Sequence, residues 1–165
     1  ARNQGAELAQ GNFLAFLDSD DLWLPDKLAR QLAAFEANTS LDIVFGHVQQ
    51  FYSPELNETD RQAIRIPQPV MPGYHVGTML IRREAFFRVG LFETHLKLAE
   101  FVSWYFRAVD SGTKIAMLPE VLMQRRLHQA NLGRATNLDK SEYARVLKAS
   151  LNRRRVIQHN RTNGD

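Results

Sequence analysis

Hydrophobic runs bounded by glycine, proline or acidic residues alternate along this chain with segments that repeat their apolar positions at helical spacing. The clearest run is the apolar stretch 13–17, which follows Gly11 and leads directly into the acidic segment 18–21. A short apolar run of this kind is typical of a strand covered on both faces, so we expect a central strand of a parallel or mixed sheet. Ligands of such sheets bind beyond the carboxyl ends of the strands, where the acidic segment would lie.

The remaining pattern alternates between helices and strands, which indicates an α/β fold with a mixed sheet flanked by helices. Further strands are expected at 43–48, 77–81, 114–117 and 121–127, and helices at 3–10, 26–37, 84–89, 96–110 and from residue 138 onward. The first helix should end at Gly11 in a left-handed cap. Prolines between Tyr52 and Pro72 argue against a long helix or an interior strand, so a long loop is expected there, either a binding flap or a disordered excursion.

The composition is ordinary for a globular protein. The chain has 165 residues, enough for one domain with a sizeable core, and it has no apolar run long enough to span a bilayer. The absence of cysteine excludes disulfides and thiolate metal sites, so a bound metal would need oxygen or imidazole ligands. The net charge is +3, with basic residues gathered at 125–126 and 153–155. This charge suits anionic diphosphates or lipid headgroups as well as nucleic acid.

The acidic segment carries three carboxylates, on Asp18, Asp20 and Asp21. Carboxylates this close raise one another's pKa unless a cation neutralises them. Hard oxygen ligands of this type suit Mg²⁺ or Mn²⁺ that holds phosphates. For an isolated Asp-x-Asp pair, a solvated acidic turn ahead of the next helix is the favoured alternative. The surrounding sequence therefore has to decide between the two interpretations.

Several segments along the chain carry a recognisable resemblance. In order they are Ala1-Arg2-Asn3-Gln4-Gly5, Phe16-Leu17-Asp18-Ser19-Asp20-Asp21-Leu22-Trp23, Val89-Gly90-Leu91-Phe92-Glu93 and Arg126-Leu127-His128. Over roughly the first 130 residues they resemble the family 2 glycosyltransferases, which have the GT-A fold. Family members begin with a strand, a helix and a second strand that hold the nucleobase. The resemblance therefore implies that Ala1 opens within the catalytic domain and that this chain is its C-terminal part, inactive in isolation.

The resemblance implies a metal site at the acidic segment. Asp20 would bind Mn²⁺ or Mg²⁺ directly, Asp18 would touch the ribose or sugar of the donor, and Asp21 would cap the helix region ahead. His128, at the end of a strand, would face the metal or the diphosphate. Neutral imidazole is a competent ligand for Mn²⁺, although a lone histidine is more often structural.

The resemblance also implies contacts to the nucleotide sugar. Arg2 and Asn3 match the family's Ala-Arg-Asn block, which lies against the nucleotide, whereas without the resemblance they would be an ordinary chain end. Arg125 and Arg126 would clamp phosphate oxygens. Trp23, just past the acidic segment, is the candidate for stacking on a sugar or base.

The head of the long helix departs from the family pattern. The family carries Glu-Asp there, with the Asp as catalytic base in inverting members, but this chain reads Glu100-Phe101. Glu100 is the nearest carboxylate, yet one helical residue turns the side chain by about 100°. Either Glu100 is the base of a variant subgroup, or the protein binds a donor without transferring it.

These features predict a metal-dependent glycosyltransferase, inverting and using a UDP-linked sugar, with a saccharide, lipid-linked or peptide acceptor. A non-catalytic nucleotide-sugar or carbohydrate-binding module is one alternative, favoured by the missing Asp at 101. A nucleotidyltransferase is the other, since it would share the α/β core and the metal carboxylates. The chain lacks the glycine-rich phosphate loop with a lysine that nucleotidyltransferases usually carry.

The C-terminal part is expected to be separate, with a partial GT-A domain at 1–137 and a helix with a basic tail at 138–165. In the tail, Arg153–Arg155 follows the apolar positions Tyr143, Val146 and Leu147. Such a helix can lie on an anionic membrane, which would suit a lipid-linked acceptor, or pack on its own domain, which the pattern favours. We expect a cytoplasmic protein with no nucleic-acid partner, and membrane contact would place it at the inner face.

Overall fold

The computed structural model describes residues 1–64, 66, 68–129, 131 and 140–162, with side chains up to 156. Its elements in chain order are α1 (Arg2–Leu8), β1 (Phe13–Ala15), β2 (Leu22–Trp23), α2 (Lys27–Ala37), β3 (Ile43–Tyr52), α3 (Glu58–Ala63), β4 (Val70–Pro72), β5 (Leu80–Arg82), α4 (Arg83–Val89), α5 (Glu100–Asp110), β6 (Ile115–Leu127) and α6 (Ser141–Thr162). The strands form a six-stranded sheet in the order β1-β5-β3-β6-β2, with β4 paired to β3. Strands β3 and β6 are parallel and the other pairs are antiparallel. The predicted mixed sheet is confirmed.

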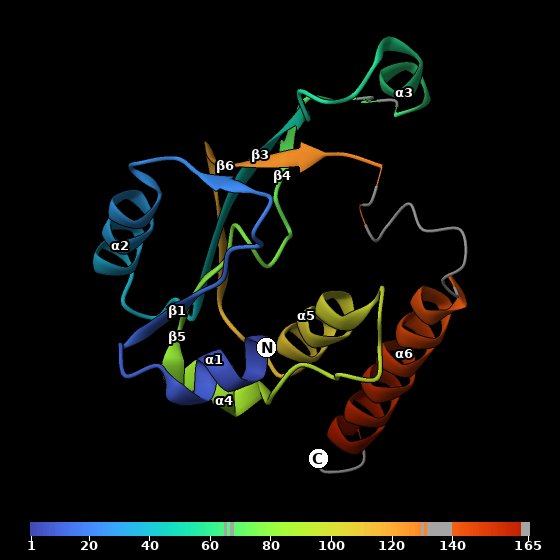
Figure 1. Cartoon of the computed structure of the whole chain (residues 1–165). Helices are drawn as coiled ribbons and strands as arrows, with labels where there is room; N and C mark the ends of the chain where they lie inside the picture. The colour runs from blue at the N-terminus through green and yellow to red at the C-terminus, as the bar shows by residue number, and fades with distance from the viewer. Residues whose placement is uncertain (65, 67, 130, 132–139, 163–165) are drawn as a thin grey trace.

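Helices cover both faces of this sheet (Figure 1). Because side chains alternate along a strand, Ile43 and Phe45 of β3 face one side and Val44 faces the other. The first two belong to the main core, with contributions from α1, α4 and α5. Val44 packs with Phe35 of α2 and Leu80 in a smaller cluster on the opposite face. The sheet therefore forms the middle layer of three.

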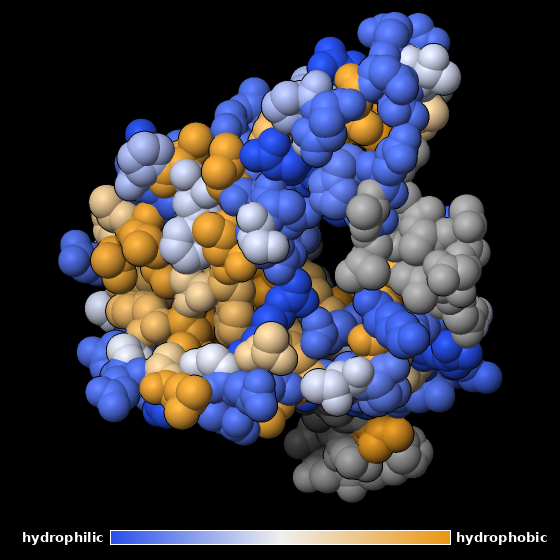
Figure 2. Space-filling view, in the orientation of Figure 1, coloured by the Kyte–Doolittle hydropathy of each residue, from blue (hydrophilic) through white to orange (hydrophobic). Residues whose placement is uncertain are grey.

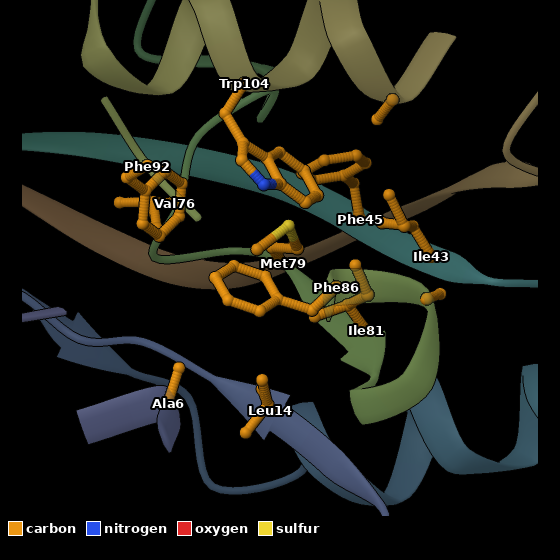
Figure 3. Close-up of a cluster of buried hydrophobic side chains, with 12 residues drawn as sticks. Ala6, Leu14, Ile43, Phe45, Val76, Met79, Ile81, Phe86, Phe92 and Trp104 are labelled. Carbon is orange, nitrogen blue, oxygen red and sulfur yellow. The ribbon is translucent and has the colours of Figure 1, made fainter. Parts of the chain in front are cut away.

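Trp104 of α5 extends from its helix into the main core (Figure 3). Trp104 is fully buried and stacks on Phe86 of α4, with ring centroids 5.6 Å apart. Its indole N–H donates to the carbonyl of Gly90 at 2.7 Å, which satisfies the one polar group of the ring. Gly90 has a φ of 95°, as expected for the glycine that ends α4. These contacts fix α5 against the sheet.

Two predictions about the strands are wrong. The segments 114–117 and 121–127, expected as separate strands, form one long strand, β6. The pairing of β6 with β3 shifts its register between Phe45 and Val48, and this irregularity accommodates Pro119. The long loop expected between Tyr52 and Pro72 contains α3 and β4. Helix α3 is capped by Asn57, whose side chain accepts from the Asp60 N–H, and β4 pairs with β3.

Strand β1 differs from the expectation of a central strand. It spans only Phe13–Ala15 and pairs with β5 alone among the described strands, so it lies at the edge of the sheet. The preceding helix ends at Leu8, with Ala9 as an extended C-cap, so the predicted cap at Gly11 is wrong. A space-filling view shows hydrophobic side chains gathered over β1 and α2 (Figure 2).

The apolar residues Leu28, Leu32 and Phe35 recur at helical spacing and predict one buried face for helix α2, but the helix buries a different face. Leu28 and Leu32 are exposed, while Lys27, Gln31 and Phe35 are buried. The Lys27 ammonium donates to Gln31 Oε1 at 2.7 Å and lies 4.4 Å from the centre of the Trp23 ring. Burial lowers the pKa of Lys27 to about 8. This cation therefore makes the folded state less stable at neutral pH than an apolar side chain of the same length would.

Helix α6 lies alongside α5 (Figure 1). Val146 and Ser150 are buried, and the helix continues to Thr162. The boundary predicted at 137/138 falls outside the described residues. None of the described helices has both the length and the apolar content needed to cross a bilayer.

The lowered pKa of Lys27 predicts a specific pH dependence. Between about 8 and its ordinary value of 10.5, the unfolded state binds more protons than the folded state, so stability rises with pH in this window. We expect Lys27→Met to be more stable than the unchanged protein by up to about 3 kcal/mol at pH 7, an advantage that shrinks towards pH 10. Urea denaturation at both pH values measures it. Lys148→Met, at an exposed position, is the control, and the same pH dependence in both variants would contradict the prediction.

Candidate functional site

A cavity of about 510 Å³ lies where several strand ends and helix ends meet. The segment after β1, the loop before β5, the end of β6 and the first turns of α1, α5 and α6 all contribute to it. Of the site residues predicted from the sequence, six line this cavity: Arg2, Asp18, Asp20, Glu100, Arg125 and His128. A shallower groove of about 740 Å³ runs along α1 and β1 and shares Arg2, Asp18 and Glu100 with it. The predicted candidates are thus brought together from positions far apart in the chain.

Arg2 joins two carboxylates across the cavity. Its Nη2 donates to Asp18 Oδ1 at 2.6 Å and its Nη1 donates to Glu100 Oε2 at 2.7 Å. These charge-assisted bonds use the fork geometry of the guanidinium, one nitrogen for each acid. All three side chains are partly exposed, so they remain accessible from the cavity. The guanidinium therefore holds the predicted base and the predicted donor contact in one arrangement.

Asp20 and His128 form a second pair in the cavity. His128 Nε2 and Asp20 Oδ2 are 2.8 Å apart, although 108 positions separate the two residues in the chain. The hydrogen bond with His128 lowers the pKa of Asp20 and so favours its carboxylate form. Both predicted metal ligands thus lie side by side, with Arg125 contributing a nearby positive charge.

Asp21 is not a helix cap, contrary to the prediction. It is 7% exposed, and its Oδ1 accepts from the Arg126 backbone N–H at 2.9 Å. The N-cap residue of α2 is Asp26. Burial raises the pKa of Asp21, with further contributions from Asp20 and Asp18. The mutual rise in pKa expected among the three acids therefore occurs at Asp21 and not at Asp20.

Three predicted site residues are absent from the cavity lining. The Asn3 side chain accepts from the Phe92 N–H and donates to the Phe92 carbonyl, so it holds α1 to the segment after α4. The Trp23 indole donates to the Gly77 carbonyl at 2.8 Å. Arg126 donates through Nε to the Asp20 carbonyl and lies over the Phe51 ring. In this structure all three support the site from outside it.

His75 lines the cavity and was missed from the sequence. Its Nδ1 accepts a hydrogen bond from the Gly77 N–H at 3.0 Å, and burial lowers its pKa to about 4. A ring whose Nδ1 accepts carries its proton on Nε2. The available signal was its position in the Gly73–Gly77 segment, just before the predicted strand that forms β5, whose first residue pairs with the last residue of β1.

The residues present fit a hard divalent cation. One candidate group is Asp18, Asp21 and His75, each with a ligand atom within 4.8 Å of the others. In that group the His75 Nδ1 lone pair and one Asp21 oxygen already accept backbone N–H groups. Asp20 and His128 offer a carboxylate and an imidazole that lie 2.8 Å apart, and this mixed oxygen and nitrogen set suits Mn²⁺.

Comparison with known proteins establishes the family. The model described as Glycosyl transferase family 2 matches residues 1–95, more than half of the chain. The chain belongs to glycosyl transferase family 2. The resemblance inferred from the Asp18–Asp21 segment and its neighbours is thereby confirmed.

Curated relatives agree with this membership. The chain is 26% identical over 153 residues to the amylovoran biosynthesis glycosyltransferase AmsE of Erwinia amylovora, an alignment that covers 86% of this chain and 56% of AmsE. A shorter match, 39% identical over 49 residues, links 30% of this chain to 19% of WfgD of Escherichia coli. The chain thus spans about half the length of AmsE.

Solved structures confirm the GT-A fold. The structure of S. aureus TarS in complex with UDP-GlcNAc matches 92% of this chain and 45% of the TarS chain, with a TM-score of 0.66 and 16% identity. The TarS structure in complex with UDP matches with a TM-score of 0.56 and 18% identity, covering 92% of this chain and 49% of that chain. At such identities the likeness shows the fold alone.

The Asp20–His128 pair predicts how metal binding responds to mutation. We expect Asp20→Asn to lower Mn²⁺-dependent affinity for UDP about 10-fold or more, because one charged ligand is lost. Calorimetry on the protein produced from its complete reading frame, with and without Mn²⁺, measures this. Asp26→Asn, an exposed carboxylate outside the cavity, is the matched control. Unchanged Mn²⁺-dependent binding in Asp20→Asn would exclude Asp20 as a ligand.

Proposed function

We propose that the protein carrying this chain is an inverting, metal-dependent glycosyltransferase that moves a sugar from a UDP-linked donor to an acceptor hydroxyl. The observation that carries the proposal is the cavity in which Arg2 bridges Asp18 and Glu100 while Asp20 contacts His128. A transferase needs a carboxylate base on one side of the donor and a charge-stabilising site on the other, and the cavity offers both. The TarS complexes with UDP-GlcNAc and UDP support a UDP-sugar donor.

Each residue has a defined part in this reaction. The acceptor oxygen forms a bond to the anomeric carbon as the bond from that carbon to the diphosphate oxygen breaks, so UDP leaves. Glu100 accepts the proton of the acceptor hydroxyl, and Arg2 holds its carboxylate in place. Mn²⁺ or Mg²⁺, held by Asp20 and His128, would offset the negative charge of the diphosphate. Arg125 lines the same cavity and can donate to phosphate oxygens.

A non-catalytic nucleotide-sugar-binding module is the second candidate. The observation in its favour is Phe101, which occupies the position where the family carries its aspartate base. Its ring packs near Trp104 and Tyr105 and lines the cavity without offering a proton acceptor. A protein that binds UDP-sugars tightly, yet releases no UDP with any acceptor, would fit this candidate instead.

Glu100 supplies the decisive test of the catalytic proposal. We expect Glu100→Gln to lower turnover about 10²-fold or more while donor affinity is kept, because the amide cannot accept the proton. UDP release with a panel of UDP-sugars and Mn²⁺ measures turnover, and NMR of the product gives its anomeric configuration. Glu84→Gln, on an exposed surface of α4, is the control. Equal turnover in Glu100→Gln and unchanged protein would move the base elsewhere.

We propose a lipid-linked acceptor at an anionic membrane surface. WfgD, by its name, is a glucosyltransferase that acts on a diphosphoundecaprenol-linked sugar. Tyr143, Leu147 and Leu151 are exposed along one side of α6. Two basic residues, Lys148 and Arg155, are also exposed on this helix. Apolar and basic side chains together suit an anionic bilayer surface.

The membrane proposal needs a variant that leaves the helix packed. Arg153 and Arg154 both donate to Asp110 of α5, so replacing them would also loosen α6. We expect the double change Lys148→Glu and Arg155→Glu to lower binding to phosphatidylglycerol-containing liposomes about 30-fold or more, since each basic residue contributes about 1 kcal/mol near such a surface. Flotation measures this, with Arg30→Glu on α2 as the control. Flotation that is equal in all three proteins would refute membrane contact through α6.

A further inference from the structure

The first turn of α5 has no cap from its own segment. A helix begins with backbone N–H groups that lack a partner within the helix. The N-cap residue here is Ala99, whose methyl side chain cannot accept a hydrogen bond. The next residue is Glu100, the first residue of the helix and the proposed base. Without another partner, the backbone that leads into Glu100 would be loosely held.

Glu142 of α6, from 43 to 45 positions further along the chain, accepts from the N–H group of the N-cap residue Ala99 and from those of the two residues before it, a contact that we call the Glu142 cap. Its Oε2 accepts from the backbone N–H groups of Leu98 at 2.8 Å, Lys97 at 3.1 Å and Ala99 at 3.2 Å. Glu142 as a whole residue is only 8% exposed. The hydrogen bonds, led by that from Leu98, lower the pKa of Glu142. A carboxylate is therefore fixed against the three residues that precede Glu100.

A second carboxylate links α6 to the C-terminal end of α5. Asp110, the last residue of α5, accepts from Ser150, Arg153 and Arg154 of α6. Asp110 does not line the cavity, whereas Lys97 and Leu98 do. Two carboxylates thus join the same pair of helices, one at the cavity and one away from it.

We propose that Glu142 is a positioning residue, which holds the start of α5 so that the Glu100 carboxylate meets the reacting hydroxyl. The proposal rests on the proposed function of Glu100. Catalytic groups have to be held within about 0.5 Å of their productive geometry, and a side chain moves whenever its own backbone moves. Three hydrogen bonds to residues 97–99 restrict that movement directly. Arg2, the other group that holds Glu100, acts on the end of the side chain and leaves the backbone free.

Steady-state kinetics separates positioning from binding. We expect Glu142→Ala to lower kcat about 10-fold or more, with KM for the UDP-sugar changed less than about twofold. Glu142→Gln keeps one oxygen that accepts N–H groups, so it should recover most of kcat. Asp110→Ala is the matched control, because it removes the carboxylate that joins the same helices away from the cavity. We expect kcat of this variant to stay within about twofold of the unchanged protein.

Amide hydrogen exchange provides a readout that does not depend on activity. Protection at Leu98 and Ala99 should fall in Glu142→Ala and persist in Asp110→Ala. If protection falls in Glu142→Ala while kcat is unchanged, the cap is real and the positioning role is refuted. Equal losses of kcat in Glu142→Ala and Asp110→Ala would also refute it, in favour of general helix docking. If Glu100→Gln keeps full turnover, the proposed base fails, while the exchange result still decides the cap.

Discussion

The parallel pairing of β3 with β6 is the interaction on which the rest of the structure depends. These two long strands form the centre of the sheet, with β5 and β1 on one side and β2 on the other. Their pairing joins segments about 70 residues apart in the chain and brings the end of β6 back beside the acidic segment after β1. Arg125 and His128 can line the cavity only because this ladder is in register. The irregularity near Pro119 is tolerated because hydrogen bonding resumes on both sides of it.

Much of the site could be predicted because its residues lie in local sequence patterns. Asp18 and Asp20 follow an apolar strand, His128 follows another, and Glu100 begins an amphipathic helix, so each could be placed at the end of an element. Pairing in the sheet then brings these ends together, as the contact between Asp20 and His128 shows. The family resemblance, confirmed over residues 1–95, added the chemistry that position alone does not give.

The features that escaped prediction are contacts between residues far apart in the sequence. The apolar positions of α2 predicted the helix but not its orientation, because the buried face is set by the Lys27–Gln31 pair and by bonds from Gln31 to the carbonyls of Val44 and Thr78. Asp21 looked like a local cap, yet its partner is the backbone of Arg126 on β6. His75 has no neighbouring acid in the sequence and meets Asp18 and Asp21 only after folding. Local spacing carries no information about such partners.

The Glu142 cap also has a consequence for biosynthesis. The amide groups of residues 97–99 leave the ribosome more than 40 residues before the carboxylate that binds them. At ordinary elongation rates of about 5–20 residues per second, the growing chain spends a few seconds with the start of α5 uncapped. During this interval the sheet and its aromatic core can already assemble, since their contacts come from the segment ending at Leu127. The order of synthesis therefore makes the start of α5 one of the last parts of the cavity to become rigid, so a nascent chain would acquire its fold before it acquires a fully ordered cavity.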